Sequence, residues 1–107
     1  MFMDIYSALA DPTRRNILEL LANNGLLSAS DISSNFQMSQ PAISQHLKVL
    51  RVAKLVDMEK QAQKHLFKIN PHKLLEMEGW IHKMTKVWSE RFARLDNLLE
   101  EDKKERG

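Results

Sequence analysis

The sequence predicts a mostly α-helical protein with one small β-hairpin, and two observations lead to this fold class. Over most of the chain, apolar residues recur at steps of three and four residues, the spacing of an amphipathic helix. Between about residues 56 and 70 they alternate instead around a polar turn, which is typical of two paired strands. With 107 residues, of which 43% are hydrophobic and 28% charged, the chain is expected to form a single domain over residues 1–107.

The first two helices are predicted from apolar spacing and from the residues at their starts. Phe2 to Leu9 place apolar side chains along one side of a short helix. Asp11 is a typical N-cap residue, and Pro12 occupies the first helical position, where its missing N–H leaves no partner unsatisfied. Gly25 is expected to end this second helix.

Two further short helices follow, and both have recognisable starts. Ser28, with Asp31 three residues later, resembles the capping box of a third helix. Ser39 is expected to cap a fourth helix over about residues 39–53. Pro41 is tolerated in that helix because the first turn has no intrahelical partners for its N–H groups.

The stretch "SQPAISQHLKVLR" in the fourth helix divides into two faces. At 100° per residue, Ile43, Leu47 and Leu50 fall within one narrow sector, which is expected to be buried. The opposite side carries Pro41, Ser44, Gln45 and Lys48. No Asp or Glu occurs anywhere between Ile32 and Val56, so this exposed side is polar and free of acids.

The β-hairpin is predicted over about residues 56–70, around the turn "KQAQK". Two short helices joined by a tight turn and followed by a hairpin make a winged helix-turn-helix. In this motif the second helix of the pair enters the major groove of DNA, and the hairpin, or wing, reaches the neighbouring backbone. The fourth helix is therefore the expected recognition helix.

The exposed side of the recognition helix has the chemistry of a base-pair reader. Gln offers the donor and the acceptor that adenine N6 and N7 require, Ser can serve in either role, and Pro41 could approach a thymine methyl. The total absence of acids favours DNA over an ordinary solvated helix face. The residues placed to meet phosphates are Lys48 and Arg51 on the helix and Lys60, Lys64 and His65 on the hairpin.

The last helix is predicted over about residues 71–101, a length of about 45 Å. An a/d stripe runs along it, formed by two series that each repeat every seven residues: Leu74, Ile81, Trp88, Leu95 and Met77, Met84, Arg91, Leu98. Such a stripe outruns the core that it could cover, which predicts pairing with a second copy of the chain. The alternative is that Trp80 to Trp88 pack on the second helix of the same chain.

Three blocks follow one another along the chain: "YSALADPTRRNILELL", "MSQPAISQHLKVLRVAKLV" and the hairpin end "HLFKINP". In this order they resemble the arsenical-resistance-repressor (ArsR) family of bacterial winged-helix transcription factors. The resemblance covers nearly the whole chain. It implies a homodimeric repressor, held by its first and last helices, that binds an inverted-repeat operator in double-stranded DNA, commonly in its own promoter. Two departures concern turns: the family's usual glycines are Gln37 and Ala62 here, so strain or another turn type is expected.

With this resemblance, two sets of site residues are predicted. The DNA-binding residues are Ser39, Gln40, Pro41, Ser44, Gln45, His46, Lys48, Arg51, Lys60, Lys64 and His65. The dimer-interface residues are Ile5, Leu9, Trp80, Ile81, Met84, Trp88, Phe92 and Leu95. His46 lies at the edge of the buried sector, so we expect a half-packed ring that reaches a phosphate.

Neither a metal nor a cofactor is expected. Many members of the family bind metals through a "CVCDL"-like box, and this chain has "SASDI" there and no Cys at all. Hydroxyls do not supply the soft anionic ligands that arsenite or cadmium requires. The helical pairs His72–Glu76 and Glu78–His82 are more typical of simple ion pairs. A metal-responsive regulator using these residues stays an alternative, as does an unknown small-molecule effector.

Other classes of protein are less consistent with the sequence. An enzyme is not expected, because the four histidines are scattered and no Gly-rich phosphate loop or Ser-His-Asp signature occurs. A winged-helix protein-interaction module is the second alternative, but it would have no need for an acid-free recognition helix. Neither a signal peptide nor a membrane span is expected, which suits a bacterial cytoplasmic protein that lies on the nucleoid DNA.

Overall fold

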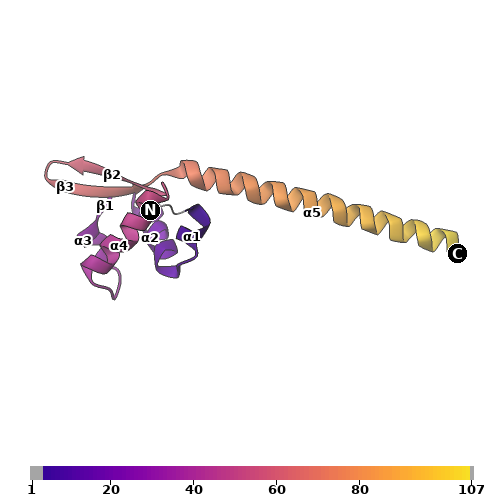
Figure 1. The fold of residues 1–107 in the computed structure, drawn as a ribbon, viewed down its shortest axis with the longest axis horizontal. Coiled ribbons are helices and arrows are strands. Elements are labelled where there is room, and N and C mark those ends of the chain that lie inside the picture. The colour runs from indigo at the N-terminus through magenta and orange to yellow at the C-terminus, as the bar shows by residue number, and fades with distance from the viewer. Residues whose placement is uncertain (1–3, 107) are drawn as a thin grey trace. The chain divides into compact units, whose positions relative to one another are not determined.

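The structure, a computed structural model, describes residues 4–106 and divides the chain into two compact units, Met1–Leu75 and Glu76–Gly107. Phe2, the predicted start of the first helix, lies outside the described residues. Figure 1 shows the elements in chain order: α1 (Ile5–Leu9), α2 (Pro12–Asn24), β1 (Leu27–Ser28), α3 (Ala29–Ser33), α4 (Gln40–Val52), β2 (Val56–Gln61), β3 (Lys64–Ile69) and α5 (Pro71–Arg106). The predicted helices and hairpin are all present, and each unit is described by itself.

The helices of the first unit start at the predicted caps. Asp11 Oδ1 accepts the backbone N–H groups two and three residues later, at 2.8 and 3.2 Å. Ser28 and Asp31 form the predicted capping box, with N···O distances of 3.1 and 3.4 Å. Ser39 Oγ accepts the backbone N–H three residues later at 3.3 Å and so opens α4. These short local bonds satisfy N–H groups that have no partner within the helix.

A third strand joins the hairpin, and the sequence did not predict it. The sheet is antiparallel in the order β1-β3-β2, and β1 pairs Leu27 with Phe67 and Ser28 with Leu66. Two residues are too few to show an alternation of apolar and polar side chains. The strand forms because β3 offers it an edge with unpaired backbone groups.

The core of the first unit lies between the helices and one face of the sheet. Ile43, Leu47 and Leu50, the predicted buried face of α4, are at most 1% exposed. Their neighbours in this core come from α2, α3, the segment between α4 and β2, and β2 itself. The largest fully buried side chains are Ile17, Leu21, Ile32, Ile43, Leu47, Leu50, Leu55 and Val56.

The second unit holds the greater part of α5. This helix begins after Asn70, whose Oδ1 accepts the backbone N–H of His72 at 3.0 Å, and its 36 residues span about 54 Å. It ends at Arg106, five residues beyond the predicted end at residue 101. Ten of its large apolar side chains are exposed, and Trp88 is 67% exposed. Within residues 4–106, no helix combines the length and the apolar content needed to cross a membrane.

Gln37 and Ala62, which stand where the resemblance leads us to expect glycine, adopt different backbone conformations. Ala62, the first of the two residues between β2 and β3, has a φ of +56°, in the left-handed region that favours glycine. Gln37 is not among the described residues with positive φ, so the turn before α4 is of another type. Backbone strain is therefore present at the wing turn and not at the turn before α4.

Replacing Ala62 with glycine tests this strain. We expect Ala62→Gly to raise the free energy of unfolding by about 0.5 to 1 kcal/mol, because the left-handed conformation is unfavourable for a residue with a Cβ. Ala22→Gly, at an exposed helical position, is the matched control and should lower it by about 0.5 to 1 kcal/mol. Urea unfolding of the three proteins measures both changes. A lower free energy of unfolding in Ala62→Gly would show that the backbone of Ala62 is not strained.

Candidate nucleic-acid interface

Helix α4 presents its predicted polar face to solvent while its apolar face is buried. The exposed predicted residues on or next to this helix are Ser39, Gln40, Pro41, Ser44, Gln45, Lys48 and Arg51. The neutral hydrogen-bonding groups gather in the first half of the helix, and the two cations lie in the second half. This order separates groups that can read base edges from groups that suit phosphates.

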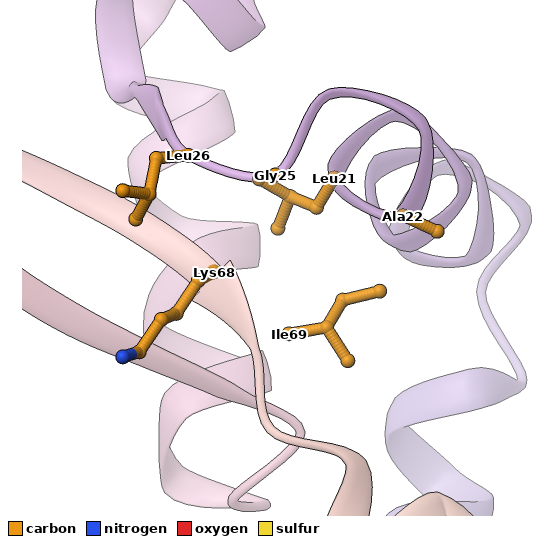
Figure 2. Close-up of a pocket in the computed structure, with 6 residues that line it drawn as sticks. All are labelled: Leu21, Ala22, Gly25, Leu26, Lys68 and Ile69. Carbon is orange, nitrogen blue, oxygen red and sulfur yellow. The ribbon is translucent and has the colours of Figure 1, made fainter.

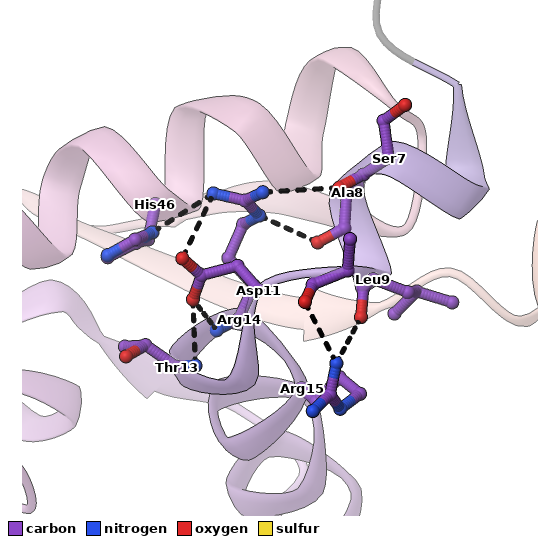
Figure 3. Close-up of polar contacts among 9 residues, drawn as sticks. Ser7, Ala8, Leu9, Asp11, Thr13, Arg14, Arg15 and His46 are labelled. Atoms are coloured by element: carbon purple, nitrogen blue, oxygen red, sulfur yellow. Dashed lines mark hydrogen bonds and ion pairs between the residues drawn. The ribbon is translucent and has the colours of Figure 1, made fainter.

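His46, at the edge of the buried sector, is half-buried as expected, but its partner was not predicted. Arg14 Nη1 on α2 lies 3.4 Å from His46 Nδ1 (Figure 3). The Arg14 side chain is only 15% exposed. Because the two residues are 32 positions apart, no local pattern in the sequence could have paired them.

Arg14 has further partners in α1 and at the N-cap of α2 (Figure 3). Its guanidinium donates to the carbonyl oxygens of Ala8 at 2.6 Å and Ser7 at 3.2 Å, and it lies 3.9 Å from Asp11 Oδ2. Burial of the Asp11 carboxyl would raise its pKa. The backbone N–H groups that it accepts, together with the charge of Arg14, nevertheless hold the pKa below its ordinary value of 3.8. Asp11 therefore stays ionised at neutral pH.

The wing distributes its predicted phosphate contacts over two faces. Lys60 pairs directly with His65, and Gln61 with Lys64, across the two-residue turn. Side chains of a cross-strand pair share a face, and successive pairs alternate between faces. Lys60 and His65 therefore lie on the face that also carries buried Phe67, whereas Lys64 lies on the opposite face. All three side chains are exposed near the tip.

The cations differ in their availability. Lys68 Nζ lies 3.5 Å from Glu59 Oε2 across the hairpin, so its charge is partly neutralised. Among the described residues, no ion pair involves Lys48, Arg51, Lys60 or Lys64. These four side chains are exposed, and no ion pair must be broken before they meet a phosphate.

A hollow of about 570 Å³ lies between the second half of α4 and strand β2. Its lining residues are Lys48, Arg51, Val52, Val56, Asp57 and Met58. It brings two predicted phosphate contacts beside the first strand of the wing. It also brings Asp57 close to them, an acid that follows directly after the acid-free stretch of the sequence. The surface around α4 is therefore less uniformly basic than the sequence suggests.

A second hollow, of about 420 Å³, lies between the end of α2 and strand β3 (Figure 2). Its lining residues are Leu21, Ala22, Gly25, Leu26, Lys68 and Ile69. None of the predicted DNA-binding residues lines it. Its only charged side chain, Lys68, is the one that pairs with Glu59. This hollow is therefore separate from the candidate nucleic-acid interface.

The segment "SASDI", which the resemblance places at the family's metal box, has a structural role here. Ser28 Oγ accepts the N–H of Asp31 as part of the capping box of α3. Within the described residues, no group of three His, Cys, Asp or Glu side chains is placed to hold a metal ion. The expectation that the protein needs no metal stays a prediction.

Comparison with known proteins agrees with this geometry. Residues 11–58 match the family model described as "Bacterial regulatory protein, arsR family". The transcriptional repressor SdpR of Bacillus subtilis is 35% identical over 78 residues, which are 73% of this chain and 86% of that protein. The arsenical resistance operon repressor of Staphylococcus xylosus is 42% identical over 72 residues, 67% of each chain.

A solved structure gives the same result for the fold. The ArsR-like transcriptional regulator from Rhodococcus sp. RHA1 superposes with a TM-score of 0.82 at 26% identity, over 90% of this chain and 87% of that one. The predicted winged helix-turn-helix is thereby confirmed. The family comprises transcriptional regulators, which are not enzymes, and this confirms the predicted class as well. The chain belongs to the arsR family of bacterial regulatory proteins and is a DNA-binding transcriptional regulator with a winged helix-turn-helix.

Proposed function

We propose that the protein is a homodimeric repressor that binds an inverted-repeat operator through α4 and the β2–β3 wing, in the bacterial cytoplasm. The observation that carries this proposal is the face of α4, which is exposed, polar and free of acids while the opposite face is fully buried. A helix held in this way can enter a major groove without exposing apolar side chains to solvent. Its relatives SdpR and the arsenical resistance operon repressor are named as repressors, which supports the same role here.

In this proposal the first half of α4 reads bases. Gln40, Ser44 and Gln45 are exposed, and their side chains carry both donors and acceptors. Base edges in the major groove, that of adenine among them, require such groups. Pro41 is exposed beside them and offers an apolar contact for a thymine methyl. Ser39 uses its oxygen as an acceptor for the helix cap, which leaves its O–H free to donate to a phosphate.

The cations provide the affinity that does not depend on sequence. Lys48 and Arg51 on α4 and Lys60 and Lys64 on the wing would each displace counterions from the phosphate backbone. His65 shares a face with Lys60 and would add a hydrogen bond at the same place. Contacts from both a helix and a wing fix the register of α4 in the groove.

The dimer is proposed from the apolar stripe of α5. Trp80, Ile81, Met84, Trp88, Phe92 and Leu95 are 40 to 67% exposed in the single chain. A contiguous apolar surface of this kind marks a protein interface. Leu9 of α1 is half-buried and can join this interface, but Ile5 is only 9% exposed. The predicted contribution of Ile5 to the dimer stays a prediction, and most of its surface is already buried in the core of its own unit.

Selection of binding sites from random DNA tests the proposal. We expect the purified protein to recover an inverted repeat whose half-sites lie about 34 Å apart or at a multiple of that distance, because a two-fold dimer presents two α4 helices. Gln45→Ala should lower affinity for the recovered site about tenfold, since one bidentate base contact is lost. Fluorescence anisotropy with the recovered and a scrambled duplex measures this change.

The controls separate the alternatives. Asn23→Ala removes an exposed amide from α2 and should leave operator affinity unchanged. Recovery of no consensus would favour a protein-interaction module, and recovery of an unrepeated site would contradict the dimer. A consensus that appears or disappears with added divalent metal would favour the metal-responsive alternative through the His and Glu residues of α5.

The salt dependence of binding tests the wing. We expect Lys60→Ala and Lys64→Ala each to reduce the slope of log affinity against log salt by about 0.9, because each removes one phosphate contact. Lys68→Ala is the matched control on the same strands, and its smaller effect follows from its ion pair with Glu59. Equal slopes for the wild type and the three variants would show that the wing does not contact DNA phosphates.

Placing a charge in the stripe of α5 tests the dimer. Trp88→Asp should dissociate the protein, because it buries a carboxylate without a partner in an apolar interface. Ser89→Asp introduces the same charge 100° around the helix and should leave the dimer intact. Sedimentation velocity distinguishes the two species. A dimer that persists in Trp88→Asp would exclude this stripe as the interface, and dissociation of both variants would point to a general effect of charge.

A further inference from the structure

One largely enclosed side chain, that of Arg14, connects α1, α2 and the recognition helix. Arg14 on α2 donates to the carbonyl oxygens of Ser7 and Ala8 at the end of α1, and its Nη1 faces Nδ1 of His46 on α4 at 3.4 Å (Figure 3). Its side chain is 15% exposed. The guanidinium is therefore held in one orientation by fixed backbone acceptors, and His46 meets a group that has little freedom to move away.

The chemistry of this contact determines which nitrogen of His46 carries the proton. A guanidinium has five donors and no acceptor, and it keeps its charge at every pH at which proteins fold. Its contact with Nδ1 is a hydrogen bond only when Nδ1 is the unprotonated acceptor. With a proton on Nδ1, two donors would face each other at 3.4 Å. The other ring nitrogen, Nε2, must then hold the proton of the neutral ring.

We infer that Arg14 is a positioning residue, which holds His46 as the neutral Nε2–H tautomer and so presents that N–H to a DNA phosphate. Figure 3 shows the second ring nitrogen on the side of His46 away from the guanidinium. The nitrogen that faces Arg14 thus anchors the ring, and the opposite nitrogen is left to donate. This inference rests on the proposed binding of DNA by α4, and it adds a residue that does not itself touch DNA.

The neighbouring arginine provides an internal comparison. Arg15 Nη1 donates to the carbonyl oxygens of Leu9 and Ala10 at 2.6 and 3.1 Å, so it also ties the end of α1 to α2. Among the described residues, Arg15 forms no hydrogen bond or ion pair with α4. Loss of Arg15 should therefore weaken the same junction without affecting His46, whereas loss of Arg14 should affect both.

The tautomer is measured first, in the free protein. A long-range ¹H–¹⁵N NMR spectrum at pH 8 distinguishes a protonated from an unprotonated ring nitrogen by its ¹⁵N chemical shift. We expect His46 in the wild type and in Arg15→Met to show an unprotonated Nδ1 and a protonated Nε2. In Arg14→Met we expect a mixture of the two tautomers. An Nδ1–H tautomer in the wild type, or the same spectrum in all three proteins, would overturn the inference.

Affinity for the selected operator is measured next. Arg14→Met should bind about tenfold more weakly than the wild type, the loss expected for about one hydrogen bond, while Arg15→Met should stay within about twofold. In a His46→Ala background, Arg14→Met should cause no further loss, because the two residues act through one contact. Equal losses in the two arginine variants, or additive losses with His46→Ala, would show a merely structural role and overturn the inference.

A second pair of variants covers the case in which Arg14→Met does not fold. In His46→Gln the amide nitrogen can reach the position of Nε2, whereas in His46→Asn the shorter side chain ends near the position of Nδ1. We expect His46→Gln to keep operator affinity within about threefold and His46→Asn to lose about tenfold. The reverse order would overturn the inference. A wild-type protein that selects no operator would instead refute the proposed function, and the tautomer measurement would still stand.

Discussion

The burial of one face of α4 is the constraint on which the rest of the structure depends. Ile43, Leu47 and Leu50 are at most 1% exposed, and they fix the rotation of the helix about its own axis as well as its position. A rotation of α4 by one residue would bring Lys48 or His46 toward the core and expose leucine. The polar face is therefore presented to solvent in a single orientation, which a helix that reads base edges requires.

The surface around α4 carries neutral polar groups along the first half of the helix and charges of both signs beside the second half. The first half of the helix offers neutral hydrogen-bonding groups, while Lys48 and Arg51 share a hollow with Asp57 of β2. An acid near two cations reduces the local attraction for phosphates and makes binding there depend more on geometry. At the wing tip, Lys60 and Lys64 lie on opposite faces of the hairpin, and among the described residues neither forms an ion pair.

The junction around Arg14 links two surfaces with different proposed roles. It holds the end of α1, part of the proposed dimer interface, and it contacts His46 on the proposed DNA interface. Asp11 stays ionised beside it and balances part of its charge. Ser7 and Ala8 contribute backbone carbonyls and Asp11 is the N-cap of α2, so Arg14 connects the end of α1 to His46 of the recognition helix.

Local features of the sequence determined the helix starts and the two faces of α4, because caps at Asp11, Ser28 and Ser39 and a spacing of 3.6 residues act within a few positions of the chain. Only the tertiary structure decided the rest. Strand β1 exists because β3 offers it an edge, Ile5 is used by its own core, and Arg14 meets His46 across 32 residues. Each of these depends on segments brought together by burial of the common core, and no periodicity within one segment encodes which distant side chain it will meet.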